Sequence, residues 1–211
     1  MKDISIFPTE YGVASLILRE IPYRQEAYIR VQDVQPGMME QLVKECVDFC
    51  RACGAERIYW SAGNGDGQLH TAIFEMRGAS VVNPELVEHL FPVTEETVLQ
   101  WRQLLNEKMI GVDNAATVTY SDQKALLESG GAYFVHRDGH LLGLGWMEDN
   151  KLLAVAALEP GAGERVMHTL MSLVEGQTIT LEVASTNRRA IRLYEKLGFV
   201  KTREIRRWYC T

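Results

Sequence analysis

Two polar side chains near the C-terminal end of the chain have a spacing suited to contacting one ligand. Asn187 and Tyr194 are seven residues apart, in a segment where Ala190, Leu193 and Leu197 recur at helical intervals. Residues separated by seven positions lie on the same side of an α-helix. An amide donates and accepts hydrogen bonds, and a phenol with a pKa near 10 can give a proton to a base of comparable strength. By spacing alone the two side chains are able to face one ligand, and a packed aromatic with a satisfied hydroxyl is the simpler interpretation of Tyr194.

A second feature is the glycine-containing turn Gly161-Ala-Gly163, between an apolar strand at residues 152–158 and a helix at residues 164–174. Backbone N–H groups at a helix start point outward, and the helix dipole favours negative charge there. The turn is therefore a candidate cradle for a phosphate group. Glycines near a helix start are also common in ordinary turns, so this pattern by itself leaves both interpretations open.

The elements that position these residues predict a C-terminal domain at residues 86–211. Its apolar patterns give the order β α α β β β α β α β, and alternation of strands and helices after a meander indicates a mixed α/β sheet. Residues 1–82 predict a separate N-terminal α/β lobe. Its expected elements are strands at residues 27–34 and 57–60, a helix at residues 38–53 and a glycine-rich loop at residues 63–67.

The segment from Asn187 to Phe199 resembles the closing motif of the GNAT superfamily of N-acetyltransferases. That motif reads Asn-x-x-Ala-x-x-Leu-Tyr-x-x-x-Gly-Phe, and each of its positions is matched here. The earlier elements also follow the family's order, so the resemblance covers roughly residues 86–208. Residues 27–60 are similar to the second half of such a domain, with Phe74–Gly78 in the place of the Leu-Tyr-to-Gly-Phe stretch. A degenerate half-repeat and an unrelated lobe both stay open for the N-terminal lobe.

The resemblance implies a GNAT-like acyl-CoA N-acyltransferase fold and activity. Acyl-CoA, most simply acetyl-CoA, would lie between two splayed parallel strands, here residues 152–158 and 178–183. A primary amine of a small molecule or peptide would attack it directly in a ternary complex. No metal is implied, and a homodimer is compatible with this reading. The implied CoA-binding residues are Ala156, Ala157 and Leu158 beside pantetheine, Gly161, Ala162, Gly163 and Glu164 at the pyrophosphate, Asn187 along the chain, and Tyr194 near the sulfur as the catalytic acid.

The phosphate turn departs from the family pattern. The family places Arg or Gln three residues before the first glycine, whereas this chain has Leu158 there, followed by Glu159, with Glu164 at the helix start. Carboxylates near a pyrophosphate weaken its binding unless they point away or a cation compensates for them. The candidate cations are Arg165, Arg188 and Arg189. The alternative function is therefore a catalytically silent GNAT-like module that binds acyl-CoA weakly or serves as a scaffold.

Composition and charge argue against several other classes of protein. With 46% hydrophobic and 24% charged residues, the chain has the composition of a globular protein. Residues 187–207 contain eight basic residues and two glutamates, a local charge of +6. Because the net charge of the whole chain is −6, the other residues together carry −12. Such a balance argues against nucleic-acid binding as the function. The absence of a signal-peptide pattern and of a long apolar run predicts a cytoplasmic protein without a membrane span.

Several further residues have a plain structural interpretation. Cys46, Cys50 and Cys53 share one predicted helix face and lack a fourth ligand nearby, which favours buried thiols over a zinc site. His168 occupies a polar helix position and is expected to be solvated. The hairpin histidines His136 and His140 are expected to be exposed. The candidate general bases, each with a structural role as the simpler alternative, are Glu148, Glu159 and Glu182.

Overall fold

The computed structural model describes residues 2–63 and 67–211, so most of the loop predicted at residues 63–67 lies outside the described residues. The chain packs as two compact units. One comprises Met1–Ile73 with Ile205–Thr211, and the other comprises Phe74–Glu204. The chain passes from one unit to the other within two long strands, β5 (Leu69–Ala79) and β11 (Val200–Cys210).

The first unit is a mixed sheet with one long helix. Strands β1 to β4 lie in their sequence order, and β3 and β4 are parallel because helix α2 connects them as a crossover. The end of β11 pairs with β4, with Tyr209 opposite Trp60. This pairing explains why residues 205–211, grouped with the C-terminal domain by sequence, pack in the first unit. The bounds are β1 Ile4–Pro8, β2 Gly12–Ile17, α1 Ile21–Arg24, β3 Glu26–Val34, α2 Met39–Ala52 and β4 Arg57–Ser61.

Helix α2 buries one apolar face in the core of the first unit. Leu42, Cys46 and Cys50 on this face are fully buried. Burial raises the pKa of the Cys46 thiol to about 11 and that of Cys50 to about 12. Both thiols are therefore protonated at neutral pH and pack as small apolar side chains, which confirms the buried-thiol interpretation for these two residues.

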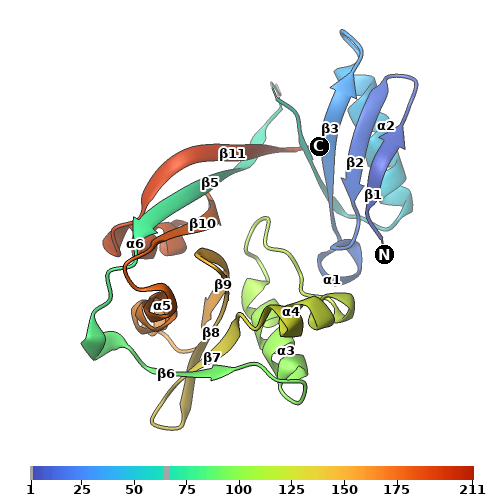
Figure 1. The fold of residues 1–211 in the computed structure, drawn as a ribbon. Coiled ribbons are helices and arrows are strands. Elements are labelled where there is room, and N and C mark those ends of the chain that lie inside the picture. Colours follow the sequence, from blue (N-terminus) through green and yellow to red (C-terminus); the bar gives the residue numbers. More distant parts are fainter. Residues whose placement is uncertain (1, 64–66) are drawn as a thin grey trace. The chain divides into compact units, whose positions relative to one another are not determined.

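The second unit is a larger mixed sheet with helices packed against it (Figure 1). Strands β6, β7, β8 and β9 form an antiparallel meander, and β9 is followed in space by β10 and β5. The predicted α/β class with a mixed sheet is confirmed. The bounds are β6 His89–Pro92, α3 Val98–Met109, α4 Gln123–Ser129, β7 Ala132–Arg137, β8 His140–Glu148, β9 Lys151–Ala157, α5 Gly163–Met171, β10 Thr178–Ala184 and α6 Arg188–Lys196, with short 3-10 helices at Pro84–Leu86, Tyr120–Asp122 and Ser172–Val174.

Alternating residues of β8 set which helix lies on which face of this sheet. Leu144 packs in one cluster with Trp101 of α3, whereas the neighbouring glycines face α5. A Cβ atom on Gly145 would lie 2.3 Å from the Leu170 side chain, and one on Gly143 would lie 2.5 Å from Val166. These glycines therefore let α5 approach the meander closely, which holds the start of α5 at the end of β9.

The structure of residues 1–82 differs from the sequence-based predictions in two places. The β1–β2 hairpin was not predicted, because its short strands carry few alternating apolar residues. The comparison of Phe74–Gly78 with a helical motif was wrong, because these residues lie in β5 and Glu75 of that strand pairs with Arg203 of β11 at 2.7 Å. Among the helices of the described residues, none is long and apolar enough to cross a membrane.

Candidate functional site

The parallel strands β9 and β10 separate soon after they meet. Their ladder holds the pairs Lys151–Thr180 and Leu152–Leu181, and among the described residues no further pair joins the two strands. β9 nevertheless continues along β8 as far as Ala157, and β10 continues to Ala184. The edge of β9 that faces β10 is therefore unpaired beyond Leu152, at the strands that the family resemblance identified for acyl-CoA.

A β-bulge lies at this point of separation. The ladder with β8 pairs Met147 with Leu152 and Trp146 with Ala154, so Leu153 has no partner of its own. The Leu153 side chain is 38% exposed. Bulges leave backbone groups unpaired and often occur beside active sites. The bulge therefore offers backbone hydrogen-bonding groups where the two strands part.

Backbone direction distinguishes the three residues expected to contact pantetheine. The N–H of Leu158 donates to the carbonyl of Leu142 on β8 at 2.8 Å. Because successive residues of a strand direct their backbone groups to opposite edges, the N–H and C=O of Ala157 point away from β8. Ala157 is therefore the one of Ala156, Ala157 and Leu158 with both backbone groups directed to the open edge.

The turn after β9 leads directly into the first turn of α5. Gly161 has a φ of +85°, a conformation that glycine adopts without strain. Ala162 is the N-cap of α5 and provides no side-chain hydrogen bond to the helix. The first N–H groups of a helix have no partner within the helix itself. Residues 162–164 therefore present backbone donors at the positive end of the α5 dipole.

The charges around this turn are largely paired. The carboxylate of Glu164 lies 2.5 Å from the Lys196 ammonium of α6. Glu88 lies 2.6 Å from the Arg165 guanidinium and 3.9 Å from that of Arg137. Lys196 therefore offsets the acid at the start of α5, which reduces the repulsion that the sequence led us to expect at a bound phosphate.

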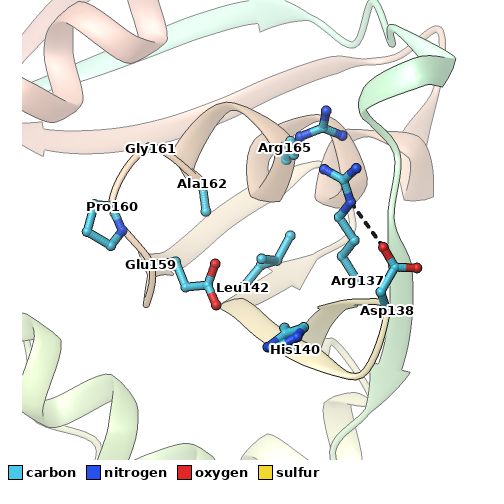
Figure 2. A pocket seen from close by; sticks show the side chains of 9 residues that line it. All are labelled: Arg137, Asp138, His140, Leu142, Glu159, Pro160, Gly161, Ala162 and Arg165. Atoms are coloured by element: carbon cyan, nitrogen blue, oxygen red, sulfur yellow. Dashed lines mark ion pairs between the residues drawn. The ribbon is translucent and has the colours of Figure 1, made fainter.

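A pocket of about 510 Å³ opens on the side of the turn that faces the β7–β8 hairpin (Figure 2). The hairpin contributes Arg137, Asp138 and His140 to the lining of this pocket. The turn contributes Glu159, the acidic residue that follows Leu158. Acids and bases are mixed among these side chains. The remaining lining residues are Leu142, Pro160, Gly161, Ala162 and Arg165.

Helix α6 begins at the end of β10 and carries the two side chains that opened the sequence analysis. The Asn187 side-chain carbonyl accepts from the N–H of Ala190 at 3.2 Å, so Asn187 is the helix N-cap. Its amide NH₂ group remains a possible donor to a ligand. At the other end, Gly198 has a φ of +86°, and the N–H of Phe199 donates to the carbonyl of Tyr194 at 2.9 Å. The helix is thus held by local interactions at both ends.

Tyr194 is buried, with 7% of its surface exposed, and its ring lies 6.0 Å from that of Phe199. Its hydroxyl forms no hydrogen bond with any described residue. This oxygen is nevertheless not completely enclosed by the protein, unlike the Trp146 ring nitrogen, which is buried without a partner. Burial raises the pKa of the phenol to about 12. The site therefore holds a protonated phenol without a protein partner.

The side chains of the candidate general bases are exposed, in contrast to the buried Tyr194. Glu148 is exposed, and Glu182 is an exposed partner of Lys151 at 3.1 Å. Sequence analysis missed Asp113, whose carboxylate accepts from the Thr186 hydroxyl at 2.6 Å next to the Asn187 cap. Asp113 belongs to the loop between α3 and α4, far from Thr186 in sequence, so no local pattern indicated this contact.

His168 is not solvated as we expected. It is 7% exposed, and its Nδ1 accepts from the backbone N–H of Asn83 at 3.2 Å. Burial lowers the pKa of the imidazole, so it stays neutral near pH 7. The expectation failed because the segment before β6 covers this side of α5. Among the described residues, no group of three or more His, Cys, Asp or Glu side chains is arranged to hold a metal ion.

Comparisons with known proteins agree with this geometry. Residues 159–209 match the family model of FR47-like proteins, whereas no curated protein matches the sequence. A GNAT-family acetyltransferase from Colwellia psychrerythraea is similar over 98% of this chain and 84% of its own, with a TM-score of 0.52 and 12% identity. GCN5-related N-acetyltransferases from Sphaerobacter thermophilus and Anabaena variabilis have TM-scores of 0.54 and 0.60.

The Sphaerobacter protein is 13% identical and covers 93% of this chain and 74% of its own; the Anabaena protein is 8% identical and covers 94% and 59%. At such identities these likenesses show a shared fold. The matched segment contains the turn after β9, strand β10 and the α6 motif. Residues 159–209 are therefore similar to FR47-like proteins, and the chain has the fold of GNAT-family acetyltransferases.

Proposed function

We propose that this protein transfers an acyl group, most simply acetyl, from acyl-CoA to a primary amine. The observation that carries the proposal is the separation of β9 and β10 after Leu152, with a helix start at the end of each strand. This arrangement provides an unpaired strand edge for an amide-containing chain and a backbone cradle for a pyrophosphate. CoA contains both groups in that order.

In this proposal pantetheine lies along the open edge of β9, where the backbone of Ala157 pairs with its amide groups. Leu158 contacts the same arm through its partly exposed side chain, whereas Ala156 packs in the buried cluster with Trp101 and holds this part of the strand in place. The pyrophosphate lies at residues 161–164, at the uncapped start of α5. The Asn187 amide donates to the chain from the opposite side. The thioester then lies near the bulge at Leu153, whose free backbone groups are available to polarise its carbonyl.

The reaction needs no covalent intermediate on the protein. The amine nitrogen forms a bond to the thioester carbon, the C–S bond breaks, and the departing sulfur acquires a proton while the amine loses one. A thiol has a pKa of about 8.5, so full proton transfer from a buried phenol with a pKa of about 12 is uphill. We therefore assign to Tyr194 a hydrogen bond to the developing thiolate, followed by proton delivery as the products separate.

The test combines binding and turnover. Acetyl-CoA at 100 times its Kd should add about 2.7 kcal/mol to the free energy of unfolding, measured as a rise in Tm. A panel of primary amines, from polyamines to N-terminal peptides, should include one that releases free CoA above the rate without amine. Binding without release by any amine would favour the silent module. The absence of a thermal shift at millimolar acetyl-CoA would refute the proposal in both forms.

A further inference from the structure

The position that is basic or an amide in the family's phosphate turn is Leu158 here, and the neighbouring Glu159 is acidic. If CoA binds as proposed, its pyrophosphate needs a positive charge from elsewhere in the second unit. Among the three arginines indicated by the sequence, Arg165 is already paired with Glu88 at 2.6 Å. The remaining candidates, Arg188 and Arg189, both lie on α6.

Two contacts between α5 and α6 decide between these arginines. A Cβ atom on Gly163 would lie 3.2 Å from Leu193, so Leu193 is next to the first residue of α5. Lys196, three positions further along α6, reaches Glu164, the second residue of α5. The side of α6 that carries Leu193 and Lys196 therefore faces the start of α5. On each of the two helices, the residue that makes the second contact lies C-terminal to the residue that makes the first.

Moving one turn back along this side of α6 leads to Arg189. At 100° per residue, Arg189 is turned about 40° from Leu193 around the helix axis, whereas Arg188 is turned about 140°. Because the contacts advance together, Arg189 lies ahead of the first turn of α5, where the free N–H groups point. Its side chain is exposed, and it forms no ion pair or hydrogen bond with any described residue.

We propose that Arg189 binds the pyrophosphate of CoA together with the backbone of residues 162–164 and so replaces the missing basic residue of the turn. This inference rests on the proposed function. A guanidinium presents two parallel N–H groups to phosphate oxygens, and Lys196 stays engaged with Glu164. None of the residues that line the hairpin pocket belongs to α6, and the pocket is not needed for this contact.

The test compares Arg189→Gln with Arg188→Gln, two exposed arginines that differ in which side of α6 they occupy. Isothermal titration would be performed with CoA, with dephospho-CoA, which lacks the 3′-phosphate, and with pantetheine, which has no phosphate. Arg189→Gln should weaken CoA and dephospho-CoA equally, by about tenfold, and leave pantetheine unchanged. Arg188→Gln should change each affinity by less than about twofold, the effect of an exposed charge in salt. Far-UV circular dichroism would verify that both variants fold.

Each contrary outcome has a definite meaning. A loss confined to CoA would assign Arg189 to the 3′-phosphate and overturn the pyrophosphate contact. Equal losses in both variants would show a general effect of charge and would also overturn it. Unchanged affinity in Arg189→Gln, with wild-type protein binding CoA, would refute the inference but leave the proposed function intact. Failure of the wild-type protein to bind CoA would remove both.

Discussion

The replacement Tyr194→Phe separates the chemical role of the phenol from its role in packing. The ring is buried against Phe199, whereas the hydroxyl has no hydrogen bond to a described residue. Phenylalanine keeps the ring contacts and removes no protein hydrogen bond. We therefore expect the free energy of unfolding at pH 8 to change by no more than about 0.5 kcal/mol, and CoA affinity to stay within about twofold.

The raised pKa of Tyr194 gives this replacement a second signature at high pH. The phenol has a pKa of about 12 in the folded protein and about 10 when unfolded. Its contribution to stability is therefore complete below pH 10 and is lost as the pH rises toward 12. The full difference of about two units corresponds to roughly 3 kcal/mol. Urea unfolding of both proteins at pH 8, 10 and 11 should show the wild type losing stability relative to the phenylalanine variant.

The catalytic consequence is a fall of about 10²-fold in the rate of acyl transfer at saturating acetyl-CoA, because the developing thiolate loses its donor. Release of free CoA would be followed with the amine found in the acceptor screen. The tyrosine itself should cause no decline in the wild-type rate near pH 10, because it ionises only toward pH 12. A variant rate within threefold of wild type would remove the hydroxyl from the mechanism and leave Tyr194 as a packed aromatic.

Three other perturbations test the site and the fold. Gly163→Val should weaken CoA binding by tenfold or more, about 1.4 kcal/mol, because its branched side chain presses on Leu193 beside the phosphate cradle. Gly163→Ala is the milder control. Equal CoA titration curves for the two variants would contradict this placement. Lys196→Met should weaken CoA binding about threefold with little change in Tm, because the Glu164 carboxylate then lacks its partner. Adding Glu164→Gln to this variant should restore the affinity for CoA. A fragment of residues 84–211 should aggregate or melt at a lower temperature than the whole chain, because it lacks β5. This strand lies between β11 and β10 in the sheet and carries the fully buried Met76. Equal stability of the fragment and the whole chain, measured by calorimetry, would refute this prediction.

Parts of the site that depend on neighbouring residues could be predicted from the sequence. The helix that starts after Asn187 and the glycine that ends it are local features, and the structure has both. The turn after β9 and the start of α5 were predicted within about two residues for the same reason. The predicted apolar stripe of Ala190, Leu193 and Leu197 is only partly buried, and the buried residues of α6 are Ile191 and Tyr194. The N-terminal hairpin and β5 were missed, because their strands are recognised by the partners beside them more than by their own alternation.

Other features were decided only by the tertiary structure. Whether β9 and β10 stay paired depends on register and on the bulge at Leu153, and neither leaves a periodic signal in either strand. The pairing of Glu164 with Lys196, the contact of Asp113 with Thr186 and the burial of His168 each join residues distant in the chain. A sequence pattern reports the face that a residue takes on its own helix or strand. The charge, pKa and accessibility of that residue are set by whichever elements fold against the face, and here those elements come from elsewhere in the chain.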